Sequence, residues 1–292
     1  MQSDKSYTRK KFSVFNVLMA VILVFYAITI IFSMYFIFAN AVKDFAVFQR
    51  GNVFGIGGFT LDNITEVLIS ESKIDDGTGV SYISVFSALI DTVLYAVGGA
   101  FFAALMPCIT AYFAAKYNYK FSKILYVTVI VVIIIPIIGN LPSTYRVLKS
   151  LNLYDSIIGM YICKANFVNM WFLVFYAAFQ SVPNDYMEAA YIDGASEFRV
   201  MVKVMLPLVR NTFFTVMLIF FVDLWNDYMT PALFLPTHST LAYMLKNYEV
   251  SNRGKVPLIM AACSVMLLPT LVIFVGFRNK LMGNLTMGGI KG

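Results

Sequence analysis

The sequence is poor in charged residues and in the side chains that usually bind metals. Charged residues make up 13% of its 292 positions, whereas a typical soluble domain has about 25%. There is a single histidine, and the three cysteines, Cys108, Cys163 and Cys263, lie in apolar segments without a CxxC pair. Isolated cysteines of this kind are usually small buried apolar side chains, so we expect neither a metal site nor a cofactor.

Two kinds of catalytic motif are also missing. The chain has no phosphate-binding loop of the form GxxxxGK followed by Ser or Thr, so we do not expect it to hydrolyse ATP itself. No cluster of His, Asp and Glu gathers at the end of an apolar segment, which argues against a membrane-embedded enzyme. No linker or low-complexity segment divides the sequence into separate domains.

Apolar sequence is abundant instead, at 60% of all residues. Six apolar segments are long enough, at about 1.5 Å per residue, to cross a hydrocarbon core of roughly 30 Å. We therefore predict an all-α membrane protein whose residues 14–280 form one transmembrane domain between two tails, 1–13 and 281–292. The predicted spans are 14–39, 85–114, 124–141, 157–180, 208–229 and 256–277.

The polar segments between these spans differ in charge. More than half of the 22 Lys and Arg residues fall in the two tails, after the second span and after the fourth. Acidic residues concentrate in the long segment 40–84, which we interpret as an external loop with a short helix near 61–70. Because positive charge accumulates on the cytoplasmic side, we expect both termini and the segment 183–207 to be cytoplasmic.

Segment 183–207 is the longest polar interruption in the second half of the chain. Its pattern predicts a helix, a break at Gly194 in the left-handed conformation, and a second helix. In the second helix an apolar stripe is expected at i, i+3, i+4 and i+7. Its members are Phe198, Met201, Val202 and Met205.

This segment resembles the cytoplasmic coupling loop of the permease subunits of bacterial ABC importers. The resemblance rests on Glu188-Ala189-Ala190, then Asp193-Gly194-Ala195, then Leu206-Pro207-Leu208. It implies a six-transmembrane-helix type I importer permease whose two-helix loop docks on a separate ATPase. The implied ATPase-coupling residues are Glu188, Ala189, Ala190, Asp193, Gly194, Leu206 and Pro207. ATP would then be bound by the partner subunit.

Further stretches are similar to carbohydrate importers of the maltose-transporter type. They are Ala111–Lys116 with Lys123, the external turn 148–157, Trp225-Asn226-Asp227-Tyr228, and the ending 277–292. The resemblance implies that the tail contacts the ATPase pair through Gly288, Gly289, Lys291 and Gly292. The chain departs from the family pattern at Asp91-Thr92, Asn152 and Asn211.

The resemblance also implies partners and a location. The partners would be a second permease with a six-span core, a dimer of cytoplasmic ATPase subunits and an extracytoplasmic solute-binding protein. The complex would lie in the bacterial inner membrane and import a sugar or oligosaccharide. Two alternatives stay open: import of another small solute, and ion-coupled secondary transport, although no internal repeat supports the latter.

Polar residues inside the predicted spans are candidates for the substrate pathway, since charge in a membrane normally faces water or a partner. Lys164 is expected to extend toward the interface rather than bind a partner, and His238 falls in a loop. Pairing with a neighbouring helix or with the partner permease, and a proton relay, are the alternatives to a pathway role. The pathway candidates are Asp91, Asp223, Trp225, Asn226 and Asp227.

Overall fold

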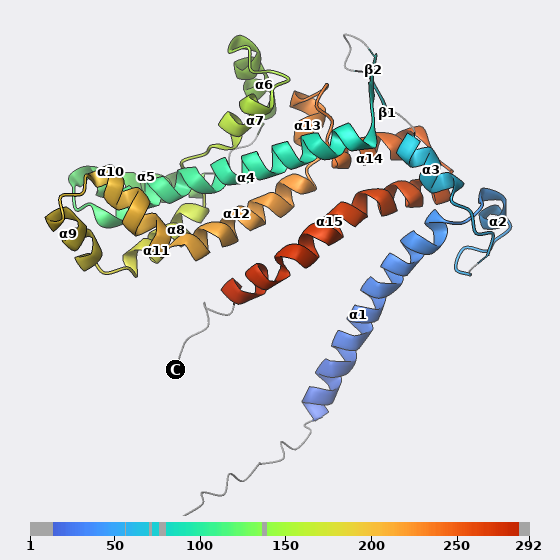
Figure 1. Ribbon diagram of the computed structural model, residues 1–292, viewed down its shortest axis with the longest axis horizontal. Helices are drawn as coiled ribbons and strands as arrows, with labels where there is room; N and C mark the ends of the chain where they lie inside the picture. The colour runs from blue at the N-terminus through green and yellow to red at the C-terminus, as the bar shows by residue number, and fades with distance from the viewer. Residues whose placement is uncertain (1–13, 56, 70–71, 76–79, 136–138, 286–292) are drawn as a thin grey trace, which may run out of the picture. The chain divides into compact units, whose positions relative to one another are not determined.

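The computed structural model describes residues 14–55, 57–69, 72–75, 80–135 and 139–285 (Figure 1). The described chain is mostly helical. It forms two compact units, Met1–Val67 with Asn252–Val265, and Leu68–Ser251 with Met266–Gly292. The longer helices are α1 (Val14–Ala41), α4 (Val85–Lys116), α5 (Lys120–Ile134), α8 (Trp171–Gln180), α12 (Arg210–Trp225), α14 (Leu241–Ser251) and α15 (Val256–Leu285).

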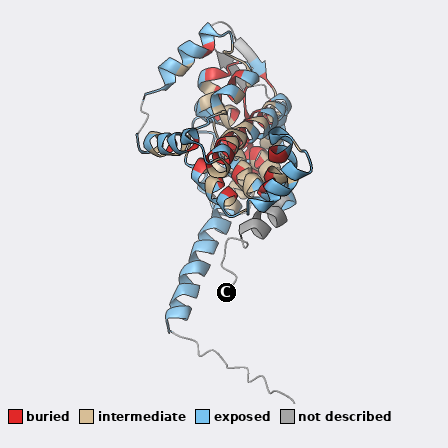
Figure 2. Cartoon of the chain, turned by 90° about the vertical axis from the view of Figure 1, so that its left-hand side faces the viewer, coloured by how far each residue is buried: buried red, intermediate tan, exposed pale blue. Residues whose placement is uncertain are grey.

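The first unit contains the apolar helix α1 and two short helices. Side chains are exposed along almost the whole of α1, as its pale blue colour in Figure 2 shows. Helix α2 (Phe45–Gln49) begins at Asp44, whose carboxylate accepts hydrogen bonds from two backbone amides. Helix α3 (Asp62–Ile69) confirms the short helix expected near 61–70.

A buried lysine organises the chain just after α1. The Lys43 side chain is only 1% exposed, and its ammonium donates to Asn40 Oδ1 at 2.9 Å and to the backbone oxygens of Asn52 at 2.8 Å and Val53 at 3.2 Å. Burial lowers the pKa of Lys43. These bonds fold the polar segment back over the end of α1, a role that the sequence did not reveal.

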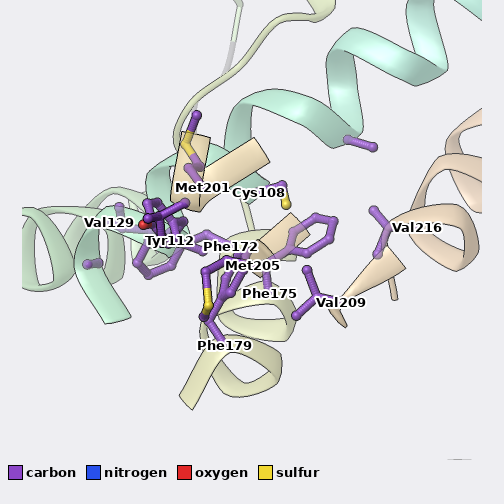
Figure 3. Close-up of a cluster of buried hydrophobic side chains, with 14 of the residues drawn as sticks. Cys108, Tyr112, Val129, Phe172, Phe175, Phe179, Met201, Met205, Val209 and Val216 are labelled. Atoms are coloured by element: carbon purple, nitrogen blue, oxygen red, sulfur yellow. The ribbon is translucent and has the colours of Figure 1, made fainter. Parts of the chain in front are cut away.

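The second unit is built around α4. Helix α4 begins after Ser84, whose hydroxyl accepts a hydrogen bond from the amide of Ser87. It runs beside α12 and also packs on α8 and on α7 (Ile157–Lys164) (Figure 1). Two apolar cores lie along it. One surrounds Tyr95, Met160 and Trp225; the other gathers Phe172, Phe175, Phe179 and Met205 (Figure 3).

Local structure also forms in segments expected to be connections. Strands β1 (Ser72–Asp75) and β2 (Val80–Ile83) make an antiparallel hairpin, so the described chain is mostly helical rather than all-α. The expected external connections contain α6 (Leu141–Ser150) and α13 (Met229–Phe234), together with α14. The sequence interpretation treated these polar segments as connections and did not indicate the helices in them.

The predicted span 157–180 is not one continuous helix. The structure divides it into α7 and α8, separated by residues 165–170. Two asparagine side chains stabilise the break: Asn166 Oδ1 accepts from the amide of Val168, and Asn169 Oδ1 accepts from the amide of Trp171, each at 2.9 Å. Side chains that satisfy backbone amides in this way offer the chain an alternative to the helix.

Other predicted boundaries shift by smaller amounts. Helix α5 ends at Ile134, consistent with Pro136, because a proline disfavours helical geometry in the preceding residue. Helix α15 continues to Leu285, beyond the predicted end at residue 277. Among the described residues, α1 and α4 are each long and apolar enough to cross a membrane, and the helices in 197–225, which are bent by 77° at their junction, would add a third only if they form one span. The count of six spans therefore stays a prediction.

Candidate functional site

The polar segment 183–207 folds as a helix, a tight turn and a second helical segment. The first helix is α9 (Asp185–Ile192), with Asp185 and Glu188 in its first turn, where carboxylates are favoured by the helix dipole. After it, Gly194 has φ +77°, which confirms the predicted left-handed conformation. The amide of Gly194 donates to the Tyr191 carbonyl and that of Ala195 to the Ala190 carbonyl, both at 3.0 Å. This is the Schellman pattern of helix termination.

The second helical segment does not bury the predicted stripe. It consists of α10 (Glu197–Val200), a π-helical turn at Met201–Met205 and α11 (Leu206–Leu208). Val200, Met201 and Met205 are buried, but Phe198 and Val202 are exposed. The buried face runs through Val200, Met201 and Met205, so only Met201 and Met205 of the predicted stripe are buried.

The segment therefore has an inner and an outer face. Its inner face joins the apolar core shown in Figure 3 through Met187, Met201 and Met205. Its outer face carries large apolar side chains, with Ile192 86% exposed and Phe198 72% exposed. Of the predicted coupling residues, Glu188, Ala189, Asp193, Gly194 and Pro207 are exposed, and Ala190 and Leu206 are half-buried.

The segment is fastened to the end of α4. The ammonium of Lys116, the last residue of α4, donates to the backbone oxygen of Val182 and to Asn184 Oδ1 at 2.9 Å. At the other end of α9, burial and the neighbouring Tyr117 phenol raise the pKa of Tyr191 to about 12. Burial and the neighbouring Tyr112 phenol likewise raise the pKa of Tyr117 to about 12.

Asp227 is held by groups of its own chain. Its Oδ2 atom accepts from the Tyr95 hydroxyl at 2.8 Å and lies 3.4 Å from the Lys164 ammonium, and its Oδ1 atom accepts from the amide of Thr230 at 3.0 Å. The expectation that Lys164 binds no partner is therefore wrong. The sequence did contain a signal for this ion pair, because a cation and an anion within the membrane spans of one chain usually pair with each other.

Asp223 and Asp227 lie within the predicted span 208–229 but not on one helix. Helix α12 ends at Trp225, so Asp227 lies in the turn beyond it. Trp225 is also internal: it is 5% exposed, and its indole nitrogen donates to Thr270 Oγ1 at 2.7 Å. Asp223 and Asn226 are instead exposed. The five pathway candidates are therefore not brought together on one surface.

Asp91 lies against the only histidine. Its Oδ1 atom is 3.4 Å from His238 Nδ1, although the sequence suggested no basic partner at this depth. The next residue, Thr92, is buried, and its hydroxyl accepts from the amide of Leu241 at 2.8 Å. These two contacts connect the first turns of α4 to the segment between α13 and α14. A separation of 147 positions in sequence hides such a pair from pattern analysis.

The structure does not describe the predicted C-terminal contact residues or the predicted N-terminal tail. Gly288, Gly289, Lys291 and Gly292 lie outside the described residues, as does the tail 1–13. In the part of the chain that is described, no three His, Cys, Asp or Glu side chains gather closely enough to hold a metal ion.

Comparison with known proteins shows which proteins are similar to this chain in sequence and in fold. Sequence relatives include the sulfoquinovosyl glycerol transport system permease SmoH of Agrobacterium fabrum, 27% identical over 64% of this chain and 67% of the relative. The arabinooligosaccharides transport system permease AraQ of Bacillus subtilis is 22% identical over 97% of this chain and 98% of its own length. These relatives are permease proteins, that is, transport components rather than enzymes.

A solved structure has a similar fold. One chain of a bacterial ABC transporter involved in the import of the acidic polysaccharide alginate aligns with a TM-score of 0.75 at 18% identity, over 91% of this chain and 96% of that chain. In addition, residues 103–281, which include α9 to α14, match the family described as the binding-protein-dependent transport system inner membrane component. The chain therefore belongs to this family of inner-membrane ABC importer permeases.

Proposed function

We propose that the chain forms half of the translocation pathway of an ATP-driven importer for a sugar or oligosaccharide. The substrate class comes from relatives named for sulfoquinovosyl glycerol, for melibiose, raffinose and stachyose, and for arabinooligosaccharides. The single observation that carries the coupling mechanism is the geometry of segment 183–207. Its inner face is anchored in the apolar core while its outer face stays exposed.

The outer face suits a protein partner. Ile192 and Phe198 lie on either side of the Gly194 turn and expose most of their side chains, and large exposed apolar groups rimmed by polar residues mark interaction sites. Glu188 is exposed in the first turn of α9, so it is free to accept hydrogen bonds from such a partner. We assign this surface to a cytoplasmic ATPase subunit, with Gly194 forming the turn between the two docking segments.

The membrane arrangement completes the proposal. Six spans place the termini and the coupling loop in the cytoplasm, as the distribution of Lys and Arg predicts. A second permease closes the pathway, a pair of ATPases drives it, and an external binding protein delivers the substrate. We further propose that the tail residues Gly288, Gly289, Lys291 and Gly292 contact the ATPase pair.

The pathway residues are assigned according to exposure. Asp223 and Asn226 are exposed on α12 and its end, and among the described residues the Asp223 carboxylate has no ion pair or hydrogen bond. A charge in a membrane span requires water or a partner, so we place Asp223 at the aqueous pathway. Trp225, Asp227 and Asp91 support this surface from within the subunit through their contacts with Thr270, Lys164 and His238.

Reconstituted transport tests the proposal. The chain should be purified with its co-purifying subunits and binding protein and placed in liposomes, and uptake of labelled raffinose and arabinotriose measured with and without ATP. We expect uptake only with ATP, and we expect Glu188→Lys to abolish it while the complex stays assembled. Glu66→Lys, the same charge change at an exposed site on α3, is the control. Uptake driven by a proton gradient without ATP would contradict the proposal.

A further inference from the structure

The last residue of α4 contacts the chain at the beginning of the proposed coupling loop. Lys116 donates to the backbone oxygen of Val182 and to the side-chain oxygen of Asn184, and helix α9 begins at the next residue, Asp185. A hydrogen bond from an ammonium is stronger than a neutral one. The two bonds therefore fix the start of α9 to the end of α4.

Aromatic packing surrounds the end of α4 beside Lys116. Tyr117 follows Lys116 directly and stacks on Phe113 of α4, with ring centroids 5.7 Å apart. The Tyr117 ring packs edge-on against Tyr112, with centroids 5.7 Å apart, and Tyr112 packs against Phe179 at 5.4 Å. Because α9 has only eight residues, the two bonds of Lys116 at its start hold this short helix close to the end of α4.

The N-terminal end of α4 makes polar contacts of its own, with His238 and Leu241. Helix α4 is continuous for 32 residues, or about 48 Å at 1.5 Å per residue. Near its start, Thr92 accepts from the amide of Leu241 and Asp91 contacts His238. One helix thus contacts the proposed coupling loop at one end and the segment between α13 and α14 at the other.

We infer that Lys116 is a positioning residue that makes α4 move together with the coupling loop when the ATPases close. This inference rests on the proposed function, because it assumes that segment 183–207 is the part that the ATPase moves. Without the Lys116 bonds, the loop would shift without carrying α4, and ATP would be hydrolysed with little import. The quantity affected is therefore the uptake per ATP hydrolysed, rather than the rate of hydrolysis itself.

Three variants in the complete importer test this role. Uptake and ATP hydrolysis are measured in the same liposomes for Lys116→Met, for Lys116→Arg, which keeps the donor, and for Lys123→Met. Lys123 is exposed, and its side chain makes no hydrogen bond or ion pair with the residues that the structure describes, so it controls for loss of charge. Loss of a charged hydrogen bond predicts that Lys116→Met lowers uptake per ATP about tenfold. Lys116→Arg should restore it, and Lys123→Met should leave it unchanged.

The outcomes separate the two proposals. If no ATPase co-purifies with the unsubstituted chain, the proposed function fails. If the ATPase does co-purify but Lys116→Met keeps its uptake per ATP, or loses uptake and hydrolysis in equal proportion, the positioning role is wrong.

A distance measurement keeps the test valid if Lys116→Met does not assemble. In a background without the three native cysteines, spin labels are attached at Asn118 and Ser196, both exposed in the structure. Their separation should be the same in nucleotide-free and ATP-bound importers, because the loop and the end of α4 move together. A change in that separation between the two states would overturn the inference.

Discussion

The phenol oxygen of Tyr95 lies 2.8 Å from Oδ2 of Asp227, and this hydrogen bond joins the middle of the second unit to the turn after α12. The Lys164 ammonium, 3.4 Å from the same carboxylate oxygen, adds α7 to the contact. Three segments that are far apart in the sequence are therefore held together by one carboxylate. Asp227 stabilises the subunit from within and is not part of its exposed surface.

Removal of Asp227 should destabilise the subunit through the lysine that it leaves unpaired. We expect Asp227→Ala to lower the free energy of unfolding by about 1–3 kcal/mol. The double variant Asp227→Ala, Lys164→Met should recover part of that loss, because no uncompensated charge remains. Thermal unfolding of the detergent-purified complex measures both. If the loss of stability in the double variant instead equals the sum of the losses in the two single variants, the Asp227–Lys164 pair contributes nothing to stability.

Asp223 should behave in the opposite way. Because it is exposed and unpaired among the described residues, Asp223→Asn should change stability by no more than about 0.5 kcal/mol. Loss of a charged hydrogen bond to a passing sugar hydroxyl should lower uptake about tenfold at limiting substrate. Transport by Asp223→Asn at the normal rate would remove Asp223 from the pathway.

Gly194 allows a test of the turn with a matched control. An added Cβ would meet nothing within 4 Å, so the cost of Gly194→Ala comes from its φ of +77° alone, about 1 kcal/mol. Gly254, with φ +96° and equally open space, carries the same backbone cost outside the loop. We expect Gly194→Ala to reduce import and Gly254→Ala to leave it intact, as measured by uptake in cells at equal membrane levels. Equal losses would mean that the turn acts only through stability.

The sequence predicted those parts of the fold that depend on local pattern. The bounds of α1 and α4 follow from continuous apolar runs, and the left-handed Gly194 follows from a residue without a Cβ. It did not predict the break between α7 and α8, because Asn166 and Asn169 act through side-chain bonds to nearby amides. The partner of Asp227 was missed for a different reason: Lys164 lies 63 positions away, and pairing at that distance depends on tertiary packing.

Orientation in the membrane is a separate prediction from charge distribution. Single cysteines are placed at Lys246, on α14, and at Ser196, in the proposed coupling loop, in a background without native cysteines. Both positions are accessible in the isolated subunit. An impermeant thiol reagent added to intact cells should label position 246 and leave 196 unlabelled until the cells are opened. Labelling of 196 in intact cells would reverse the orientation.

Cross-linking between the coupling loop and the ATPase tests the central claim most directly. Ile192, at the end of α9, is 86% exposed, and Val250, on α14, is 47% exposed and predicted to lie outside. Each is replaced by cysteine in the assembled importer, which is treated with a short cysteine-to-lysine cross-linker and analysed by mass spectrometry. The account predicts a product between the ATPase and Ile192→Cys, and none with Val250→Cys. A transporting complex in which Ile192→Cys gives no such product, or Val250→Cys does, would contradict it.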